Sequence, residues 1–180
     1  MRNKELFRGR RKAGRLVGLV LTLALAVSLL SGCGQSKERL TFGTGGTAGT
    51  YYSYGGVLAQ YITNNTNVKV TAVSTGGSKA NLQSVQDGDF QLGFVQSDVM
   101  AYAWEGVRAF EQDGATHDFR TLGGLYAETV QLFTMDPDIK TVEDLKGKSV
   151  SIGAANSGVY FNALDVLNAG GITLDDIHPQ

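Results

Sequence analysis

The stretch Leu40-Thr-Phe-Gly-Thr-Gly-Gly-Thr-Ala-Gly-Thr-Tyr-Tyr52 decides the fold that this sequence predicts. Its first four residues are typical of a short strand, and a glycine- and threonine-rich loop follows directly. Apolar residues then recur at helical spacing, which predicts a helix. The predicted apolar face of this helix consists of Tyr54, Val57, Leu58, Tyr61 and Ile62. A strand that passes through a glycine loop into a helix is the repeating unit of α/β folds.

The alternation of strands and helices continues downstream. Further strands are predicted at residues 68–73, 90–95, 122–125, 129–135 and 149–153. Helices are predicted to begin after residues 74–78, 96–98, 141–144 and 154–158. Repeated strand–helix units argue for a mostly parallel sheet covered by helices, and such sheets place ligands at the carboxyl ends of their strands. In the helix after residues 96–98, the bulky face is predicted to pack in the core. This face comprises Met100, Ala103, Trp104 and Val107.

The charge of the chain is divided unevenly. The formal net charge is −1, but residues 1–32 hold seven of the sixteen Lys and Arg residues and only one of the seventeen acids. The remainder therefore carries nine bases against sixteen acids. An acidic body with scattered bases lacks the positive surface that nucleic-acid binding requires, so no nucleic-acid partner is expected. The single cysteine cannot form an internal disulfide, and no Cys/His cluster predicts a metal site.

The first 33 residues have the organisation of an export leader. A basic segment at residues 8–15 precedes an uncharged apolar run at residues 16–30, which is shorter than the ~20 residues that a membrane-spanning helix needs. The run ends in Leu30-Ser-Gly-Cys33, which resembles the bacterial lipobox. We expect residues 1–32 to be a lipoprotein signal peptide, Cys33 to be lipidated on the outer face of the cytoplasmic membrane, and residues 33–39 to form a tether. The alternative is an uncleaved transmembrane anchor with an incidental cysteine.

Four loops share an unusual chemistry. The segments at residues 43–52, 74–78, 96–98 and 155–158 each lie between a predicted strand and a predicted helix, and each supplies hydroxyl or amide side chains. The start of a helix directs unpaired N–H groups and a positive dipole end at whatever lies in front of it. Together these loops predict a site for a carboxylate or phosphate. Taken singly, each loop is more typical of ordinary helix capping than of a binding site.

Catalytic groups are sparse in the sequence. His117 and His178 have no nucleophile beside them and are expected at the surface, and no pair of carboxylates stands out. The glycine loop lacks the Gly-Lys-[Ser/Thr] of a phosphate-binding P-loop. We therefore expect a binding protein rather than an enzyme, with no cofactor. One alternative is an α/β enzyme that holds a phosphorylated substrate with the glycine loop, for which Asp98 is the only candidate acid. Another is the sensory ligand-binding module of a signalling protein.

Several motifs in order resemble one known family. They are Thr44-Gly-Gly-Thr-Ala-Gly-Thr-Tyr-Tyr52, Ser74-Thr-Gly-Gly-Ser78, Leu92-Gly-Phe-Val-Gln-Ser-Asp98, Leu125-Tyr-Ala-Glu128 and Val142-Glu-Asp-Leu-Lys-Gly-Lys-Ser-Val150. Together they resemble the TAXI family of solute-binding proteins, which are extracytoplasmic receptors for TRAP transporters. The resemblance implies an α/β, two-lobed periplasmic-binding-protein fold of type II-like architecture. It also implies a small carboxylate ligand, such as glutamate, that is delivered to TRAP-type membrane permease subunits.

The resemblance also implies a set of ligand-binding residues. They are Thr44, Gly45, Thr47, Thr50, Tyr51, Thr75, Gly76, Ser78, Gln96, Ser97, Tyr126, Asn156, Ser157 and Gly158. This sequence departs from the family pattern at Val159, where the family usually has a hydroxyl-bearing residue.

The resemblance further implies a division into lobes. Residues 40–135 correspond to a nearly complete first lobe, and residues 136–180 to the start of a second one. Because two lobes with separate cores need about 300 residues, we expect the chain to be a fragment of a longer product, with the second lobe truncated.

Overall fold

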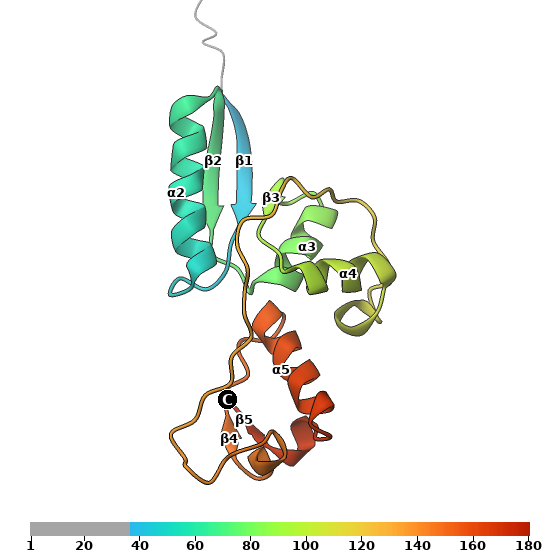
Figure 1. The fold of residues 1–180 in the computed structure, drawn as a ribbon. Helices are drawn as coiled ribbons and strands as arrows, with labels where there is room; N and C mark the ends of the chain where they lie inside the picture. The colour runs from blue at the N-terminus through green and yellow to red at the C-terminus, as the bar shows by residue number, and fades with distance from the viewer. Residues whose placement is uncertain (1–36) are drawn as a thin grey trace, which may run out of the picture. The chain divides into compact units, whose positions relative to one another are not determined.

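The computed structural model describes residues 37–180 (Figure 1). The predicted signal peptide at residues 1–32, the predicted lipidation site Cys33 and residues 34–36 of the predicted tether lie outside the described residues. Within the described part of the chain, no helix has both the length and the apolar character that crossing a membrane requires.

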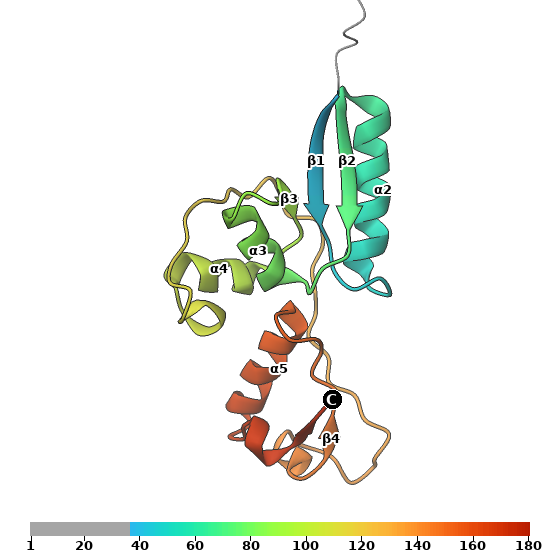
Figure 2. The same ribbon diagram turned by 180° about the vertical axis from the view of Figure 1, so that it is seen from behind.

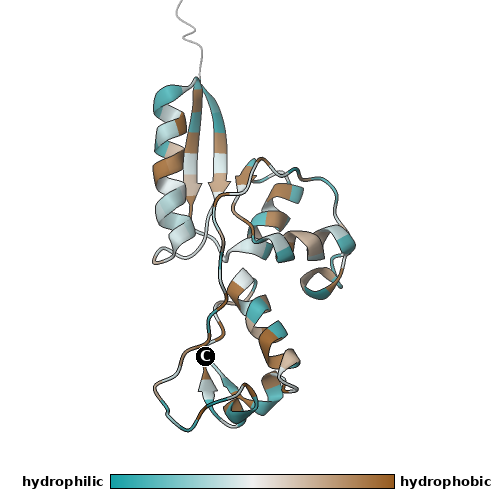
Figure 3. Ribbon diagram, viewed as in Figure 1, coloured by the Kyte–Doolittle hydropathy of each residue, from teal (hydrophilic) through white to brown (hydrophobic). Residues whose placement is uncertain are grey.

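A parallel sheet organises the first part of the described chain. It contains β1 (Glu38–Gly43), β2 (Val68–Val73) and β3 (Leu92–Gly93), in the order β2-β1-β3. β1 begins two residues before the predicted start and pairs with β2 along its whole length, from Glu38 opposite Val68 to Gly43 opposite Val73. Apolar and polar residues alternate along both strands (Figure 3). The predicted parallel α/β arrangement is therefore present in this region.

Helix α2 (Thr50–Asn65) connects β1 to β2 and lies along β2 (Figures 1 and 2). Its buried side shares one hydrophobic cluster with Phe42 of β1 and Val70 of β2. The prediction of this helix is confirmed, but the predicted apolar face is partly wrong. Gly55 and Ala59 are its buried residues, and Leu58 and Ile62 pack beside Ala59. Three members of the predicted face, Tyr54, Val57 and Tyr61, are exposed. The small residues Gly55 and Ala59 let the helix approach the sheet closely, so the buried line is rotated away from the larger side chains.

Helices α3 (Ser78–Gln86) and α4 (Ser97–Glu105) flank β3, and the prediction of core packing along α4 is wrong for two residues. Val99 and Ala103 are fully buried, whereas Trp104 is 50% exposed and its ring lies against His117 with 4.2 Å between centroids. Val107 is exposed because Gly106, in a left-handed conformation, has already ended the helix. The buried residues of α4 join Leu82, Phe110 and Phe161 in one hydrophobic cluster.

Between α3 and residue 135, one predicted strand is shorter than expected and two are absent. β3 spans Leu92–Gly93 rather than residues 90–95, because only Phe42 and Gly43 of β1 lie opposite it. The predicted strands at residues 122–125 and 129–135 are wrong, since this segment contains no regular element. A strand needs a hydrogen-bonded partner, and none of the described strands pairs with this segment. Its apolar side chains are consequently exposed, with Phe133 at 89% and Met135 at 96%.

The last part of the chain forms a second small cluster. It contains β4 (Ser149–Val150), α5 (Gly158–Ala169) and β5 (His178–Pro179), together with short 3-10 turns at Glu143–Leu145 and Leu174–Asp176. A further 3-10 turn, Arg108–Phe110, follows α4 and belongs to the cluster of that helix. β4 pairs in parallel with β5 and is shorter than the predicted strand at residues 149–153. The core of this cluster consists of Leu145, Ile152, Leu167, Ile172 and Ile177. The helix predicted after residues 154–158 is confirmed as α5.

Candidate functional site

The register of the sheet brings three of the four predicted loops to one edge. β1 and β2 end opposite each other at Gly43 and Val73, and Gly43 also lies opposite Gly93 of β3. The chain therefore leaves all three strands at the same level. The carboxyl ends of parallel strands are the usual place for a ligand site in such sheets.

Hydrogen bonds join the first two loops. The Thr44 hydroxyl, which is fully buried, donates to the Val73 carbonyl oxygen at 2.5 Å, and the Thr75 hydroxyl donates to the Thr44 carbonyl oxygen at 3.0 Å. The Gly45 carbonyl oxygen accepts from the Ser74 hydroxyl at 2.9 Å and from the Thr75 N–H at 3.2 Å. The predicted residues Thr44, Gly45 and Thr75 thus form a fixed main-chain framework for the site.

Asn81, which the sequence analysis did not single out, fixes the third loop to the first. It is fully buried in α3, and its Nδ2 donates to the carbonyl oxygens of Thr44 at 2.7 Å and Phe94 at 2.8 Å. Its Oδ1 lies 2.4 Å from where a Cβ on Gly43 would be, so no larger residue fits at Gly43. The signal in the sequence that could have identified Asn81 is its position next to Leu82, on the apolar side of a predicted helix.

The start of α3 contacts the third and fourth loops. The Ser78 hydroxyl, which is buried, accepts from the Gln96 N–H at 3.2 Å. The Lys79 N–H donates to the Asn156 carbonyl oxygen at 3.1 Å. Gly77 adopts φ 102°, and a Cβ there would lie 3.2 Å from the Cα of Ser157. The fourth predicted loop, although it comes from the β4–α5 segment, therefore lies beside the other three.

A row of polar side chains connects α4 with α5. Gln96 Nε2 donates to Asn162 Oδ1 at 3.2 Å, and Asn162 Nδ2 donates to Asp98 Oδ2 at 2.5 Å. Further along the same two helices, the Tyr102 hydroxyl donates to Asp165 at 2.7 Å. Burial, followed by this hydrogen bond, raises the pKa of Tyr102 to about 12. Sequence reasoning selected Gln96 but missed Asn162, because nothing in a single sequence places α5 against α4.

Tyr51 connects the glycine loop to the long segment after α4. Its hydroxyl donates to Glu128 Oε2 at 2.9 Å and also contacts Ser78. Burial, and then the hydrogen bond to Glu128, raise the pKa of Tyr51 well above its ordinary value. Burial and Glu128 likewise raise the pKa of Tyr126, whose ring lies edge-on to that of Tyr54 at 6.4 Å. The predicted residues Tyr51 and Tyr126 therefore both interact with the Glu128 carboxylate, and Ser78 contacts Tyr51.

The remaining predicted residues are more exposed. Thr47, Thr50, Gly76, Ser97 and Asn156 are accessible to solvent, whereas Gly158 is buried and Ser157 accepts a hydrogen bond from the Tyr160 N–H as the N-cap of α5. Gly158 lies directly against the Gln96 side chain, where a Cβ would overlap Oε1.

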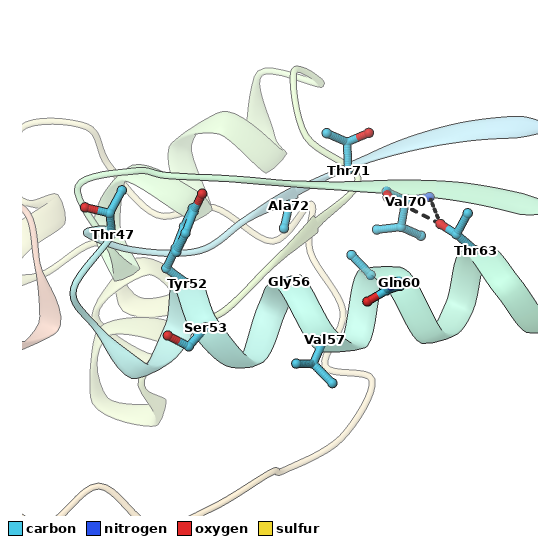
Figure 4. Close-up of a pocket in the computed structure, with 11 residues that line it drawn as sticks. Thr47, Tyr52, Ser53, Gly56, Val57, Gln60, Thr63, Val70, Thr71 and Ala72 are labelled. Carbon is cyan, nitrogen blue, oxygen red and sulfur yellow. Dashed lines mark hydrogen bonds between the residues drawn. The ribbon is translucent and has the colours of Figure 1, made fainter.

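Two hollows lie near these residues. One of about 340 Å³ is bounded by Gln96, Glu128 and Asn162 on its polar side and by apolar residues of the β4–α5 segment on the other. The other, of about 650 Å³, is an open groove between α2 and β2 (Figure 4). Thr47 is the single predicted site residue that lines this groove. The smaller hollow is therefore the one associated with the loop cluster.

Four helix starts meet in this cluster. Tyr51 near the start of α2 contacts Ser78 at the start of α3, Ser78 contacts Gln96 before α4, and Gln96 contacts Gly158 at the start of α5. The caps of α2, α3 and α4 supply no side-chain hydrogen bond. In the first turns of α3 and α4, the Lys79 N–H donates to the Asn156 carbonyl oxygen and the Val99 N–H to Asp98 Oδ1. The N–H groups of Thr50, Ser78 and Ser97, the first residues of the three helices, donate to no acceptor among the described residues and remain available to a ligand. The helix dipoles favour a negative charge there. Lys79, a base in the first turn of α3, pairs with Asp113.

This fold and this cluster agree with a comparison to known families. Residues 42–180 match the NMT1-like family, so the match covers well over half of the chain and includes all four loops. The family is of the periplasmic solute-binding type, which implies an exported protein with a small-ligand partner. The chain therefore belongs to the NMT1-like family.

Proposed function

We propose that the protein is the receptor of a TRAP-type secondary transporter and belongs to the TAXI group of such receptors. It captures a small carboxylate of the size of glutamate and delivers it to the membrane permease subunits without changing it. The observation that carries this proposal is the meeting of four helix starts at the carboxyl edge of a parallel sheet. N–H groups and hydroxyls then hold an anion although the body of the protein is acidic.

The environment of Asp98 supports binding rather than catalysis. Asp98 is the only acid that the sequence analysis found beside the glycine loop as a possible catalytic group. Its Oδ1 accepts from the Val99 N–H at 2.8 Å and its Oδ2 accepts from Asn162. A general acid or base must reach the reacting atoms of a substrate, and both oxygens of Asp98 have partners of the protein instead.

Calorimetry tests the ligand class. Glutamate, glutamine and glutarate are titrated into the protein and into a Ser78→Ala variant, and we expect a carboxylate to bind the wild-type protein more tightly than 1 mM. Ser78→Ala removes the acceptor of the Gln96 N–H and should weaken binding at least about tenfold. Ser53→Ala, at an exposed position of α2, is the matched control and should bind as the wild-type protein does. If no carboxylate binds within 1 mM, the proposed ligand class is wrong.

The proposed anchor is tested separately. Export, cleavage before Cys33 and lipidation of Cys33 predict that the protein fractionates with membranes. A Cys33→Ala variant should lose both the acyl group and the membrane association. A variant that stays acylated and membrane-bound would exclude Cys33 as the attachment point. Delivery to the permease predicts that solute uptake by cells that carry the permease genes depends on this receptor.

A further inference from the structure

The three side chains Asp98, Asn162 and Gln96 form a hydrogen-bond relay with a fixed direction. Asp98 Oδ2 is a carboxylate oxygen, which accepts hydrogen bonds, so the Asn162 group that faces it must be the NH2. The carbonyl oxygen of Asn162 then faces Gln96 and accepts from its Nε2 at 3.2 Å. The charge of Asp98 therefore decides the orientation of both amides.

The end of the relay is a buried acceptor without a partner. Gln96 Oε1 is buried and receives no hydrogen bond within the described part of the chain. It lies at the start of α5, where a Cβ on Gly158 would overlap it. Gln96, Gly158 and Ser157 all belong to the predicted site. A buried carbonyl oxygen without a donor destabilises the folded protein, and a solute that donates a hydrogen bond to it would remove this cost.

We propose that Asp98 and Asn162 are positioning residues that hold Gln96 with its oxygen toward the site, so that the receptor selects solutes carrying an N–H donor over carboxylates that lack one. This inference rests on the proposed function. The helix starts hold a carboxylate of the solute, and Gln96 Oε1 receives its ammonium or amide N–H. The selected class is thus amino acids and their amides rather than plain dicarboxylates.

Binding selectivity tests the relay. Glutamate and glutarate differ by one ammonium group, and we expect the wild-type protein to prefer glutamate by at least about tenfold. Asn162→Leu interrupts the relay while it leaves the charge of Asp98 in place, and the preference should fall to within about threefold, since Gln96 can then turn its NH2 inward. Asp98→Asn should have the same effect. If Asn162→Leu retains the full preference while Asp98→Asn loses it, charge rather than orientation is responsible and the proposal is wrong.

A rescue variant separates positioning from a merely structural role. The carboxylate introduced by Gln96→Glu has two acceptor oxygens and no donor, so it presents an acceptor to the solute whichever way it is turned. Adding Gln96→Glu to Asn162→Leu should therefore restore the preference for glutamate over glutarate. A double variant that still lacks the preference would overturn the proposal. Glu105→Gln, which removes an exposed acid from the far end of α4, is the charge control and should keep the wild-type preference.

The relay can also be tested without any ligand. In NMR spectra of the ligand-free protein, the chemical shifts of the Gln96 side-chain NH2 should show that one of its protons is hydrogen-bonded. These chemical shifts should change in both Asp98→Asn and Asn162→Leu. Unchanged Gln96 signals in both variants would exclude the relay. If the relay is present but none of the three carboxylates binds the wild-type protein, the proposed ligand class fails while the orientation of Gln96 stands.

Discussion

The Tyr51 hydroxyl donates a 2.9 Å hydrogen bond to Glu128 Oε2, although 77 positions separate the two residues. Tyr51 belongs to the first turn of α2, directly after the glycine loop, and Glu128 belongs to the long irregular segment after α4. Through this contact the segment lies beside the loop cluster. The Glu128 carboxylate would repel an anionic solute, and here it accepts a hydrogen bond from the Tyr51 phenol.

Alkaline pH should weaken the protein through its buried tyrosines. The pKa of Tyr51 is raised by burial and Glu128, and that of Tyr102 is raised to about 12 by burial and Asp165. Since the folded state holds these protons more tightly than the unfolded state, their contribution is complete below about pH 10 and is lost as the pH rises further. Urea titrations between pH 8 and pH 11.5 should show the free energy of unfolding falling above about pH 10.

Replacing both tyrosines isolates this effect. In a Tyr51→Phe, Tyr102→Phe variant the decline above about pH 10 should be shallower than in the wild-type protein. Tyr61→Phe, at a side chain that is 65% exposed, is the control and should follow the wild-type curve. A double variant with the wild-type slope would mean that other groups cause the decline.

Two adjacent glycines in α2 should respond oppositely to alanine. A Cβ at Gly55 would lie 2.5 Å from Thr44 Cγ2, whereas a Cβ at Gly56 would meet nothing within 4 Å. Gly56→Ala should raise the free energy of unfolding by about 0.5–1 kcal/mol through helix propensity. Gly55→Ala should lower it by about 1–2 kcal/mol, because overpacking outweighs the same gain. Thermal unfolding of both variants measures the difference, and equal behaviour would contradict the close approach of α2 to Thr44.

The loop cluster was accessible to sequence reasoning because it depends on local rules. Alternating β-branched residues predicted the strands, and glycines predicted the turns. Because the strands pair in parallel, the loops after Gly43, Val73 and Gly93 leave the sheet at the same edge. For Asn81 the sequence offered only its position beside Leu82, and for Asn162 it offered no signal. Their importance comes from which main-chain or side-chain atoms lie opposite them, and such pairings between distant elements leave no pattern in one sequence.

The wrong predictions of secondary structure and burial also have physical causes. Residues 129–135 have strand propensity, but propensity produces a strand only where a partner is present, and the described residues provide none. Trp104 was assigned to the core because it shares a helical face with Met100 and Ala103 in the sequence pattern. The actual buried line of α4 passes through Val99 and Ala103, and the indole lies on the surface with His117.

The irregular segment at residues 117–135 should be recognisable by fast hydrogen exchange of its main-chain amides. Residues 117–135 donate no main-chain hydrogen bond to another main-chain atom among the described residues. Their amides should exchange near the rate of an unstructured chain, while the amides of β1 are protected by pairing with β2. Strong protection at residues 129–135 would mean that this segment forms the strand that its sequence favours, with a partner of its own.

Asn81 should be the polar side chain whose loss most disturbs the site framework. Asn81→Ala leaves a cavity and removes the donors from the Thr44 and Phe94 carbonyl oxygens, which should lower the free energy of unfolding by roughly 2–4 kcal/mol. Asn64→Ala, at an exposed position of α2, should change it by less than about 0.5 kcal/mol. Because the same amide holds the first and third loops together, Asn81→Ala should also weaken solute binding under conditions where the variant is still folded. Wild-type affinity in a destabilised Asn81→Ala protein would show that Asn81 supports the core without ordering the site.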